Sequence, residues 1–188
     1  MYTMESVEHT IRDVRTYSHA LLTWAAARRL VPSGPNVAAW GALGAALPDL
    51  PVIAGALWLG ARRRRWPTRQ VLCEEACEKG PFREPDAALH SALPAVLLLA
   101  LCLTSGTGKR RPAPPAFFLG WLGHVLADAL THAKDARPIL WPLSRRRFRG
   151  PVSYWDHAHH APPFALAEHG ALLFVAAWIF SRNFPETG

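Results

Sequence analysis

The chain has few cysteines, and they do not form a disulfide framework. Of the three, Cys73 and Cys77 are four residues apart and Cys102 lies in an apolar run, and no Cys-x-x-Cys pair occurs. This set excludes a small fold held together by several disulfides. We therefore expect free, reduced thiols.

The sequence also lacks strand-like alternation, internal repeats and a recognisable signal peptide. Residues 1–17 are polar and mixed in charge, without the apolar core that a signal peptide needs. The remaining chain is long enough for one domain with a sizeable core. We predict a single helical domain over residues 1–188, with 1–17 as a polar lead-in.

What the chain has instead is long apolar runs separated by basic clusters. The runs cover residues 37–60, 87–104, 116–133 and 165–180, and the clusters cover 62–65, 109–111 and 145–149. A membrane-spanning helix needs about 20 mostly apolar residues, so each of the four runs is predicted to span. A fifth run, 18–31, opens with Ser18 as a good N-cap. It is short for a span and fits a re-entrant or interfacial helix.

These runs predict an all-α, polytopic membrane bundle of about four to five helices in a bacterial cytoplasmic membrane. The net charge of +7 also suits nucleic acid, but the arginines flank apolar runs instead of lining one helix face. Basic flanks are typical of proteins that contact an anionic cytoplasmic leaflet. We therefore expect membrane lipid, and no nucleic acid, as the partner.

The distribution of lysine and arginine also predicts an orientation. Seven lie in the connection between the first and second runs and six in the connection before the last run. Only four, three and one lie in the remaining parts. The positive-inside rule then places the loops 62–83 and 134–149 in the cytoplasm.

The most distinctive motif is His124-x3-Asp128-x3-His132. On a helix, these side chains fall within an arc of roughly 80°, and two imidazoles with a carboxylate are natural metal ligands. His124 and His132 lie about 12 Å apart along the axis, too far to bind one ion together. Either Asp128 lies between two ions, or one histidine binds an ion and the other supports it.

Ionisable residues recur near the interior of every apolar segment. A charge at the centre of a bilayer costs at least about 2.5–3.5 kcal/mol, so one shared polar site explains the recurrence better than separate accidents. The alternative is a soluble helical protein with core histidines and helix-end carboxylates. The residues are His19, Asp49, His90, His124 with Asp128, and Glu168 with His169. Asp49 lies between Pro48 and Pro51, which predict a break in the first run that frees backbone carbonyls toward a protected interior.

Residues 134–164 form a long, polar, His- and Arg-rich segment, and loops of this length are often functional. Asp156 there, or Glu168 beyond it, is a candidate general base. Its histidines either complete a metal site, shuttle protons or are solvated; they are His157, His159 and His160. Its arginines either hold an anionic headgroup or are positive-inside flanks; the candidates for headgroup binding are Arg145, Arg147 and Arg149.

Several short motifs occur in a fixed order: Ser18-His19, Leu47-Pro48-Asp49-Leu50, His90-Ser91, His124-x3-Asp128, and Leu140-Trp141-Pro142. In this order, over residues 18–150, the chain resembles the YdjM-like predicted membrane-bound metal-dependent hydrolases. His124-x3-Asp128 is also similar, more distantly, to zinc-dependent phospholipase C. The chain departs from the family pattern at two positions, with Pro51 for a second aspartate and Pro85 for a first histidine. Asp86 or the histidines at 157–160 would compensate.

Together, the residues and the resemblance imply a membrane-embedded, metal-dependent hydrolase. A bound zinc-like ion lowers the pKa of its water to about 7, which suits hydrolysis of an ester or phosphoester in a lipid or lipid-like substrate. We expect one or two divalent ions, zinc first and manganese or iron as alternatives. The predicted ligands are His19, Asp49, His90, His124, Asp128 and His132. The competing interpretations are a metal-binding or ion- and proton-handling membrane protein without hydrolysis, and a structural membrane subunit.

Overall fold

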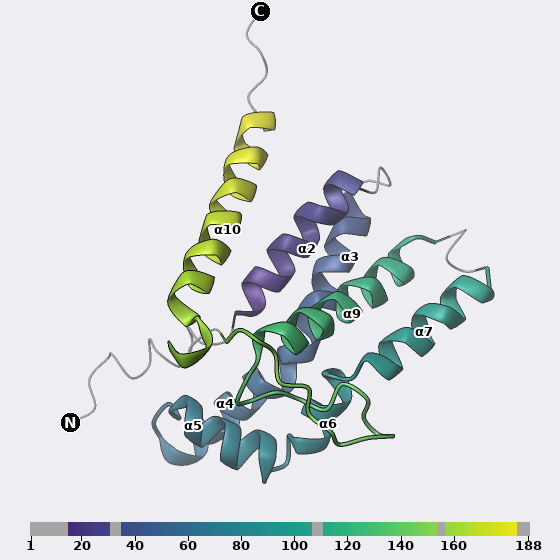
Figure 1. Ribbon diagram of the computed structural model, residues 1–188. Coiled ribbons are helices and arrows are strands. Elements are labelled where there is room, and N and C mark those ends of the chain that lie inside the picture. The colour runs from purple at the N-terminus through teal and green to yellow at the C-terminus, as the bar shows by residue number, and fades with distance from the viewer. Residues whose placement is uncertain (1–14, 31–34, 107–110, 154–156, 184–188) are drawn as a thin grey trace, which may run out of the picture.

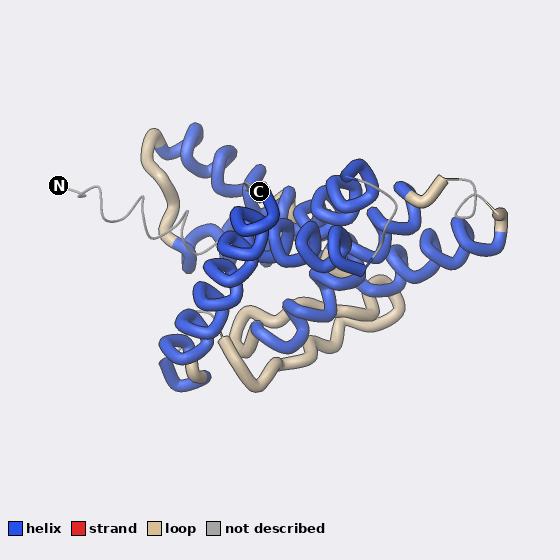
Figure 2. The backbone as a smooth tube through the Cα atoms, turned by 90° about the horizontal axis from the view of Figure 1, so that it is seen from above, coloured by secondary structure: helices blue, strands red, loops and turns tan. Residues whose placement is uncertain are grey.

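The computed structural model describes residues 15–30, 35–106, 111–153 and 157–183. Within these ranges the regular structure is entirely helical (Figure 2), which confirms the predicted all-α class. The long helices are α2 (Thr16–Leu30), α3 (Pro35–Ala46), α4 (Leu50–Arg63), α7 (Ala92–Thr104), α9 (Ala113–Thr131) and α10 (Ala161–Asn183). Shorter elements are the 3₁₀ turns η1 (Leu47–Asp49) and η3 (His157–His159), the π-helix η2 (Leu72–Glu78), α5 (Arg69–Val71) and α6 (Arg83–Leu89).

The described residues form more helical segments than the four to five expected, because two of the apolar runs are broken and the connection after α4 is itself partly helical. The first run is interrupted by η1 at Pro48 and Asp49, as the prolines predicted. The second is bent by 49° between α6 and α7. There Ser91 is extended, and its hydroxyl caps α7 by accepting a hydrogen bond from the Leu93 N–H at 3.2 Å. Both breaks leave a polar side chain, Asp49 or His90, at the end of an apolar helix.

Three boundary predictions need correction. Helix α2 begins at Thr16, so the polar lead-in is shorter than 1–17, and Ser18 lies buried inside the helix instead of capping it. Helix α10 begins at Ala161 and not at 165, because prolines in the first helical turn remove N–H groups that have no partner there. This shortens the polar segment 134–164. The connection 62–86, for which we predicted polar character and no particular structure, folds into α5, η2 and the start of α6.

This connection packs against α4 through a small apolar core, in which Val52, Ala56 and Leu59 of α4 meet Leu72 and Ala76.

The three cysteines are free, as predicted. Cys73 and Cys77 both lie within η2. Burial raises the pKa of the Cys77 thiol to about 12, so this thiol stays protonated at neutral pH.

Helix α3 packs between α2 and α9, and α7 lies on the other side of α9 (Figure 1). The contact between α3 and α9 brings backbone against backbone. A Cβ at Gly44 would collide with the carbonyl of Phe117, and one at Gly120 would collide with the carbonyl of Gly41. Small residues allow this approach, as in many membrane helix pairs. It brings the polar residues of α9 close to the end of α3.

The two loops predicted to share one side of the membrane lie together. Segment 132–153 lies beside α5, η2 and α6 at one end of the helices α2, α3, α7 and α9 (Figure 1). We call these two parts, residues 69–89 and 132–153, the polar layer. Ion pairs join them: Arg69 with Asp135 at 2.8 Å, Arg145 with Glu84 at 2.9 Å, and Arg147 with Glu78 at 2.8 Å. The C-terminal end of α7 and the N-terminal end of α9 lie at the opposite end of these helices (Figure 1).

By length and composition, Asn36–Arg63 and Ala161–Ile179 can cross a membrane, and the bent pair α6–α7 is a third candidate. Within the described residues, the run 116–133 is not a candidate, so the four spans expected become two or three. Two prolines, His124 and Asp128 lower the hydropathy of α9. Helices α7 and α10 expose apolar side chains such as Leu97, Leu166 and Phe174, a surface that suits contact with lipid.

Candidate metal centre

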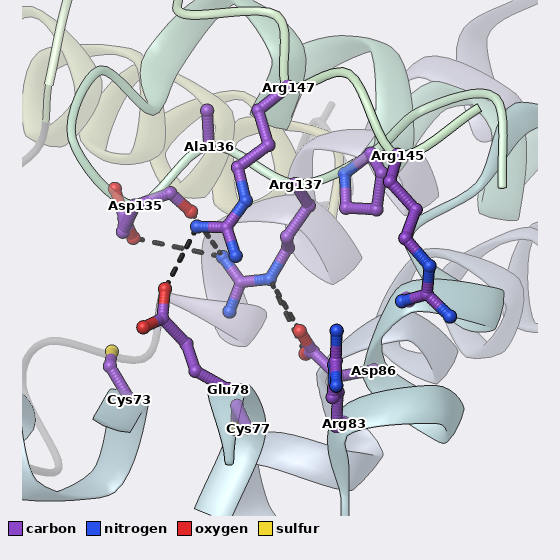
Figure 3. A pocket seen from close by; sticks show the side chains of 12 residues that line it. Cys73, Cys77, Glu78, Arg83, Asp86, Asp135, Ala136, Arg137, Arg145 and Arg147 are labelled. Atoms are coloured by element: carbon purple, nitrogen blue, oxygen red, sulfur yellow. Dashed lines mark hydrogen bonds and ion pairs between the residues drawn. The ribbon is translucent and has the colours of Figure 1, made fainter. Parts of the chain in front are cut away.

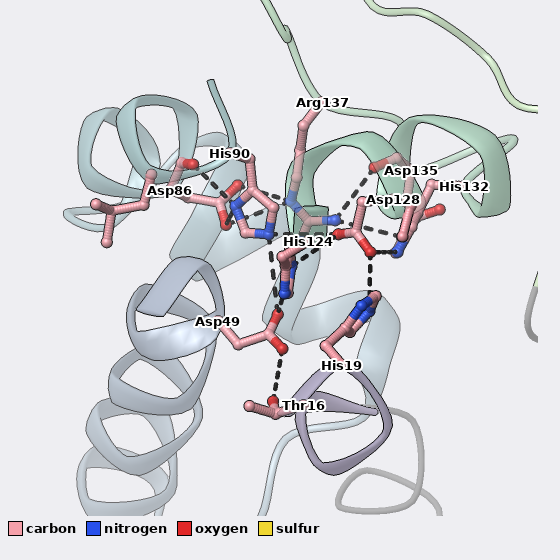
Figure 4. A network of polar contacts seen from close by, with 12 residues as sticks. Thr16, His19, Asp49, Asp86, His90, His124, Asp128, His132, Asp135 and Arg137 are labelled. Atoms are coloured by element: carbon pink, nitrogen blue, oxygen red, sulfur yellow. Dashed lines mark hydrogen bonds and ion pairs between the residues drawn. The ribbon is translucent and has the colours of Figure 1, made fainter. Parts of the chain in front are cut away.

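Six polar side chains converge where the ends of α2, α3, α7 and α9 meet (Figure 4). They are the six ligands proposed from the sequence, and all are buried or nearly so. His19 comes from α2, Asp49 from η1, His90 from the bend between α6 and α7, His124 and Asp128 from α9, and His132 from the residue after α9.

Asp128 lies at the centre of this cluster. Its Oδ1 is 3.2 Å from His19 Nε2 and 3.3 Å from His132 Nε2. Its Oδ2 is 3.3 Å from His124 Nε2 and 3.5 Å from His90 Nε2. The carboxylate therefore separates two pairs of imidazoles, one on each oxygen.

Asp49 completes one side of the cluster. Its Oδ1 lies 3.8 Å from His90 Nε2 and 3.8 Å from His124 Nε2, and the Thr16 hydroxyl donates to its Oδ2 at 2.6 Å. Ligands placed tetrahedrally 2.0–2.1 Å from a zinc ion lie about 3.3 Å apart. Asp49, His90 and His124 have ligand atoms within 4.8 Å of one another, so these three can hold one small divalent ion.

The histidines are held with Nε2 toward the centre. His124 Nδ1 lies 2.6 Å from the carbonyl of Ala45, and His90 Nδ1 lies 3.0 Å from that of Asp86. A carbonyl only accepts, so each Nδ1 carries a hydrogen, and in the neutral ring Nε2 then keeps the lone pair that a metal ligand needs. His132 Nδ1 lies 2.7 Å from a carboxylate oxygen of Asp135. Such outer hydrogen bonds are typical of metal-binding histidines.

Three buried atoms at the centre have no hydrogen bond within the part of the chain that the structure describes. They are His90 Nε2, His124 Nε2 and Asp128 Oδ1. Buried polar atoms without such partners are costly and rare. Two overlapping triads, His19–His124–Asp128 and Asp49–His90–His124, each have ligand atoms within 4.8 Å of one another. The cluster can therefore hold a metal ion, which would satisfy these atoms.

Residues 15–184 match the family described as YdjM inner membrane protein, and the six converging residues all lie within this range. The chain belongs to the YdjM family. No curated protein and no solved structure matches it, so the more distant likeness to zinc-dependent phospholipase C is not shown. Family membership and the apolar helices place this YdjM chain in the inner membrane.

Around the candidate metal centre of this YdjM chain lie supporting residues that we did not predict as parts of the site from the sequence. Thr16 lies three residues before His19 on α2, so helical spacing was an available signal for it, whereas Asp135 follows the end of α9 and had no such signal. Asp86, which was noted as a possible substitute ligand, lies four residues before His90 and supports it instead. Arg137 had no such signal, because its position depends on the path of an irregular loop.

Arg137 is buried between two of these carboxylates. Burial opposes its charge, but Asp86 and Asp135 raise its pKa well above the ordinary value. Burial also opposes the charge of Asp135 and by itself would raise the pKa of that carboxyl. The hydrogen bond with His132 and the charges of His132, Arg137 and Arg69 outweigh burial, so the pKa of Asp135 is lowered overall. Both groups stay charged at neutral pH, so their attraction persists across the physiological range.

The remaining site predictions that the structure describes fall outside the converging cluster. Glu168 forms an ion pair with Arg15 between α10 and α2, and His169 is exposed. Asp156 and the side chain of His157 lie outside the described residues, and His159 and His160 lie at or just before the start of α10. Of the arginines proposed to bind a headgroup, Arg145 and Arg147 form the ion pairs of the polar layer, and Arg149 is exposed.

Proposed function

We propose that this chain is a metal-dependent hydrolase of the inner membrane, acting on an ester or phosphoester of a lipid or lipid-like substrate. One observation carries the proposal. Imidazoles from separate helices direct Nε2 toward a buried aspartate, while their other ring nitrogens are held by carbonyls or a carboxylate. This is the arrangement of a site built to bind a divalent ion.

The spacing supports two overlapping ligand sets. Asp49, His90 and His124 form one, and His19, His124 and Asp128 form the other. Each set offers three ligand atoms and leaves room for water or substrate, and His132 Nε2, 3.3 Å from Asp128 Oδ1, adds a further ligand atom beside them. A divalent ion held there would lower the pKa of a bound water and polarise the ester bond.

The position of the site supports a lipid-like substrate. The cluster lies between helices with apolar, exposed faces and a polar layer that contains both basic loops (Figure 1). A headgroup bond lies at such a boundary when the acyl chains remain in the bilayer. Arg149, which is exposed in the polar layer, is available to bind an anionic headgroup. Arg145 and Arg147 could bind one only while also donating to Glu84 and Glu78.

The general base stays open between two residues. Glu168 is buried and paired with Arg15, next in sequence to the Thr16 that holds Asp49. To accept a proton from water, Glu168 would have to exchange this pairing for a contact with the substrate. Asp156 is the other candidate from the sequence.

The proposal is tested with full-length protein purified in detergent, supplied with zinc, manganese or iron and assayed against a panel of lipid phosphoesters and carboxylic esters. We expect metal-dependent turnover that Asp128→Ala abolishes together with bound metal. Glu75→Gln, which alters an exposed ion pair with Arg63 on the polar layer, serves as the control and should retain both. Full metal content in Asp128→Ala would remove the central ligand of the proposal.

The second candidate is a membrane protein that binds or conducts ions without hydrolysis. It is favoured by one observation: Asp49 lies near the middle of the candidate span Asn36–Arg63, where carboxylates and histidines also mark ion and proton paths. Stoichiometric metal with no turnover across the whole panel would support this candidate over the hydrolase.

A further inference from the structure

We propose that Arg137 is a positioning residue that holds the imidazoles on both sides of Asp128 in place through two carboxylates, Asp86 and Asp135. The inference rests on the metal centre of the proposed function, and it assigns to that centre a residue outside the ligand set. Figure 4 shows the guanidinium between the two carboxylates, above the converging ligands.

On one side, Arg137 acts through Asp86. Its Nε lies 3.1 Å and 3.3 Å from the two carboxylate oxygens of Asp86. Asp86 in turn holds His90 Nδ1 twice, through its backbone carbonyl at 3.0 Å and a carboxylate oxygen at 3.2 Å. The guanidinium thus fixes the group that orients His90 toward Asp49 and Asp128.

On the other side, Arg137 acts through Asp135. Its Nη1 lies 3.5 Å from the Asp135 carbonyl and 3.7 Å from a carboxylate oxygen. The same oxygen, Oδ2, accepts from His132 Nδ1 at 2.7 Å and from Arg69 at 2.8 Å. Asp135 therefore has a second arginine, and we expect the loss of Arg137 to affect His90 more than His132.

Burial makes these contacts consequential. The side chain of Arg137 is 14% exposed and that of Asp86 is 9% exposed, so neither charge is well solvated when its partner is removed. The planar guanidinium presents donors in a fixed fork, which lets one side chain contact two carboxylates in different directions. A lysine offers a single ammonium on a flexible stem and cannot do this equally well.

Arg137 also separates two spaces in the structure. It lines a small cavity beside His90, Asp128 and His132, and it lines a larger pocket of about 140 Å³ between η2 and the loop 135–147 (Figure 3). Asp86 and Asp135 line the larger pocket as well. Arg137 is therefore the one of these three residues that faces both the candidate metal centre and the pocket in the polar layer.

The test is zinc affinity, measured by competition with a chromogenic chelator on full-length protein in detergent. Arg137→Gln should bind zinc about 10–100-fold more weakly than wild type, the usual effect of removing outer support. Arg69→Gln, which disturbs only the Asp135 side, should cost less, and Arg137→Lys should fall between Arg137→Gln and wild type. Arg63→Gln removes an arginine from an exposed ion pair with Glu75 and should leave the affinity unchanged.

A coupling measurement separates positioning from general loss of structure. Because Arg137 acts through the two carboxylates, Arg137→Gln should have little further effect on zinc affinity in an Asp86→Asn, Asp135→Asn background. Where Arg137→Gln does not fold, Arg137→Lys is compared in the two backgrounds instead. An undiminished effect in the double-asparagine background, or unchanged affinity in Arg137→Gln and Arg137→Lys, overturns the inference while the metal centre stands. Absence of zinc binding by wild type overturns both.

Discussion

A metal-binding histidine usually donates a hydrogen bond from its other ring nitrogen, and a metal-binding aspartate usually accepts one at its second oxygen. Asp49 illustrates this, because Oδ1 faces His90 and His124 while Oδ2 accepts from Thr16 at 2.6 Å. The hydroxyl limits rotation of the carboxylate and fixes which oxygen faces the centre. At the residue scale, the site therefore depends on its supports as well as on its ligands.

This dependence predicts the effect of Thr16→Val, which keeps the shape of the side chain and removes its hydroxyl. We expect zinc affinity to fall about tenfold, while the melting temperature stays close to that of wild type. Thr23→Val, the same change further along α2, is the matched control and should bind zinc normally. Equal affinities in the two variants, in a chelator competition titration, would show that the Thr16 contact does not support the site.

Sequence patterns predicted the six residues that converge in the structure, but they did not predict all of the residues that support these six. His124 and Asp128 share a helix face by their spacing, and the two prolines around Asp49 predicted the break that brings this residue to the interior. Asp135 and Arg137 follow the end of α9, where the chain has no regular period. Their places are set by contacts with α6 and η2, which are distant in the sequence, so no local pattern could predict them.

At the element scale, the contact between α3 and α9 positions half of the centre. It depends on glycine at two points, since a Cβ at Gly44 or Gly120 would meet the backbone of the facing helix. The same approach lets His124 of α9 reach the carbonyl of Ala45 at the end of α3. Separating these two helices should therefore weaken both the fold and the site.

Gly120→Ala tests this contact. The added methyl group cannot be accommodated by a side-chain rotation because it meets backbone atoms, so we expect a loss of about 1–3 kcal/mol in the free energy of unfolding and weaker zinc binding. Gly123→Ala, three residues along the same helix, has open space around its Cβ and should be neutral or slightly stabilising. Thermal unfolding in detergent measures both, and equal melting temperatures would argue against the close approach.

At the scale of the whole molecule, the distribution of basic residues and the ion pairs both indicate that the two basic loops lie on the same side. The loops 62–83 and 134–149 were grouped by charge alone, and the structure joins them through pairs such as Arg69–Asp135. The hydropathy pattern was less reliable for the number of spans, because it did not distinguish a lipid-facing helix from α9, whose polar residues face other helices. Two or three candidate spans replace the four expected.

The orientation is tested by single cysteines in a cysteine-free variant that retains metal binding. Lys79→Cys and Arg146→Cys lie in the polar layer, and Arg111→Cys lies in the opposite loop; all three positions are exposed. A membrane-impermeant maleimide should label the first two only in inside-out vesicles and the third only in right-side-out vesicles. Labelling of Arg111→Cys from the same side as Lys79→Cys would contradict the arrangement.

The central claim is that histidines and aspartates from separate helices form one site for a divalent ion. It is tested most directly by elemental analysis of the full-length protein, purified without chelator and dialysed against metal-free buffer. We expect one or two equivalents of a divalent transition metal, zinc first, and less than a tenth of that amount in a His90→Ala, His124→Ala double variant that retains its helical content. Metal-free wild-type protein that also fails to take up added zinc, manganese or iron would contradict it.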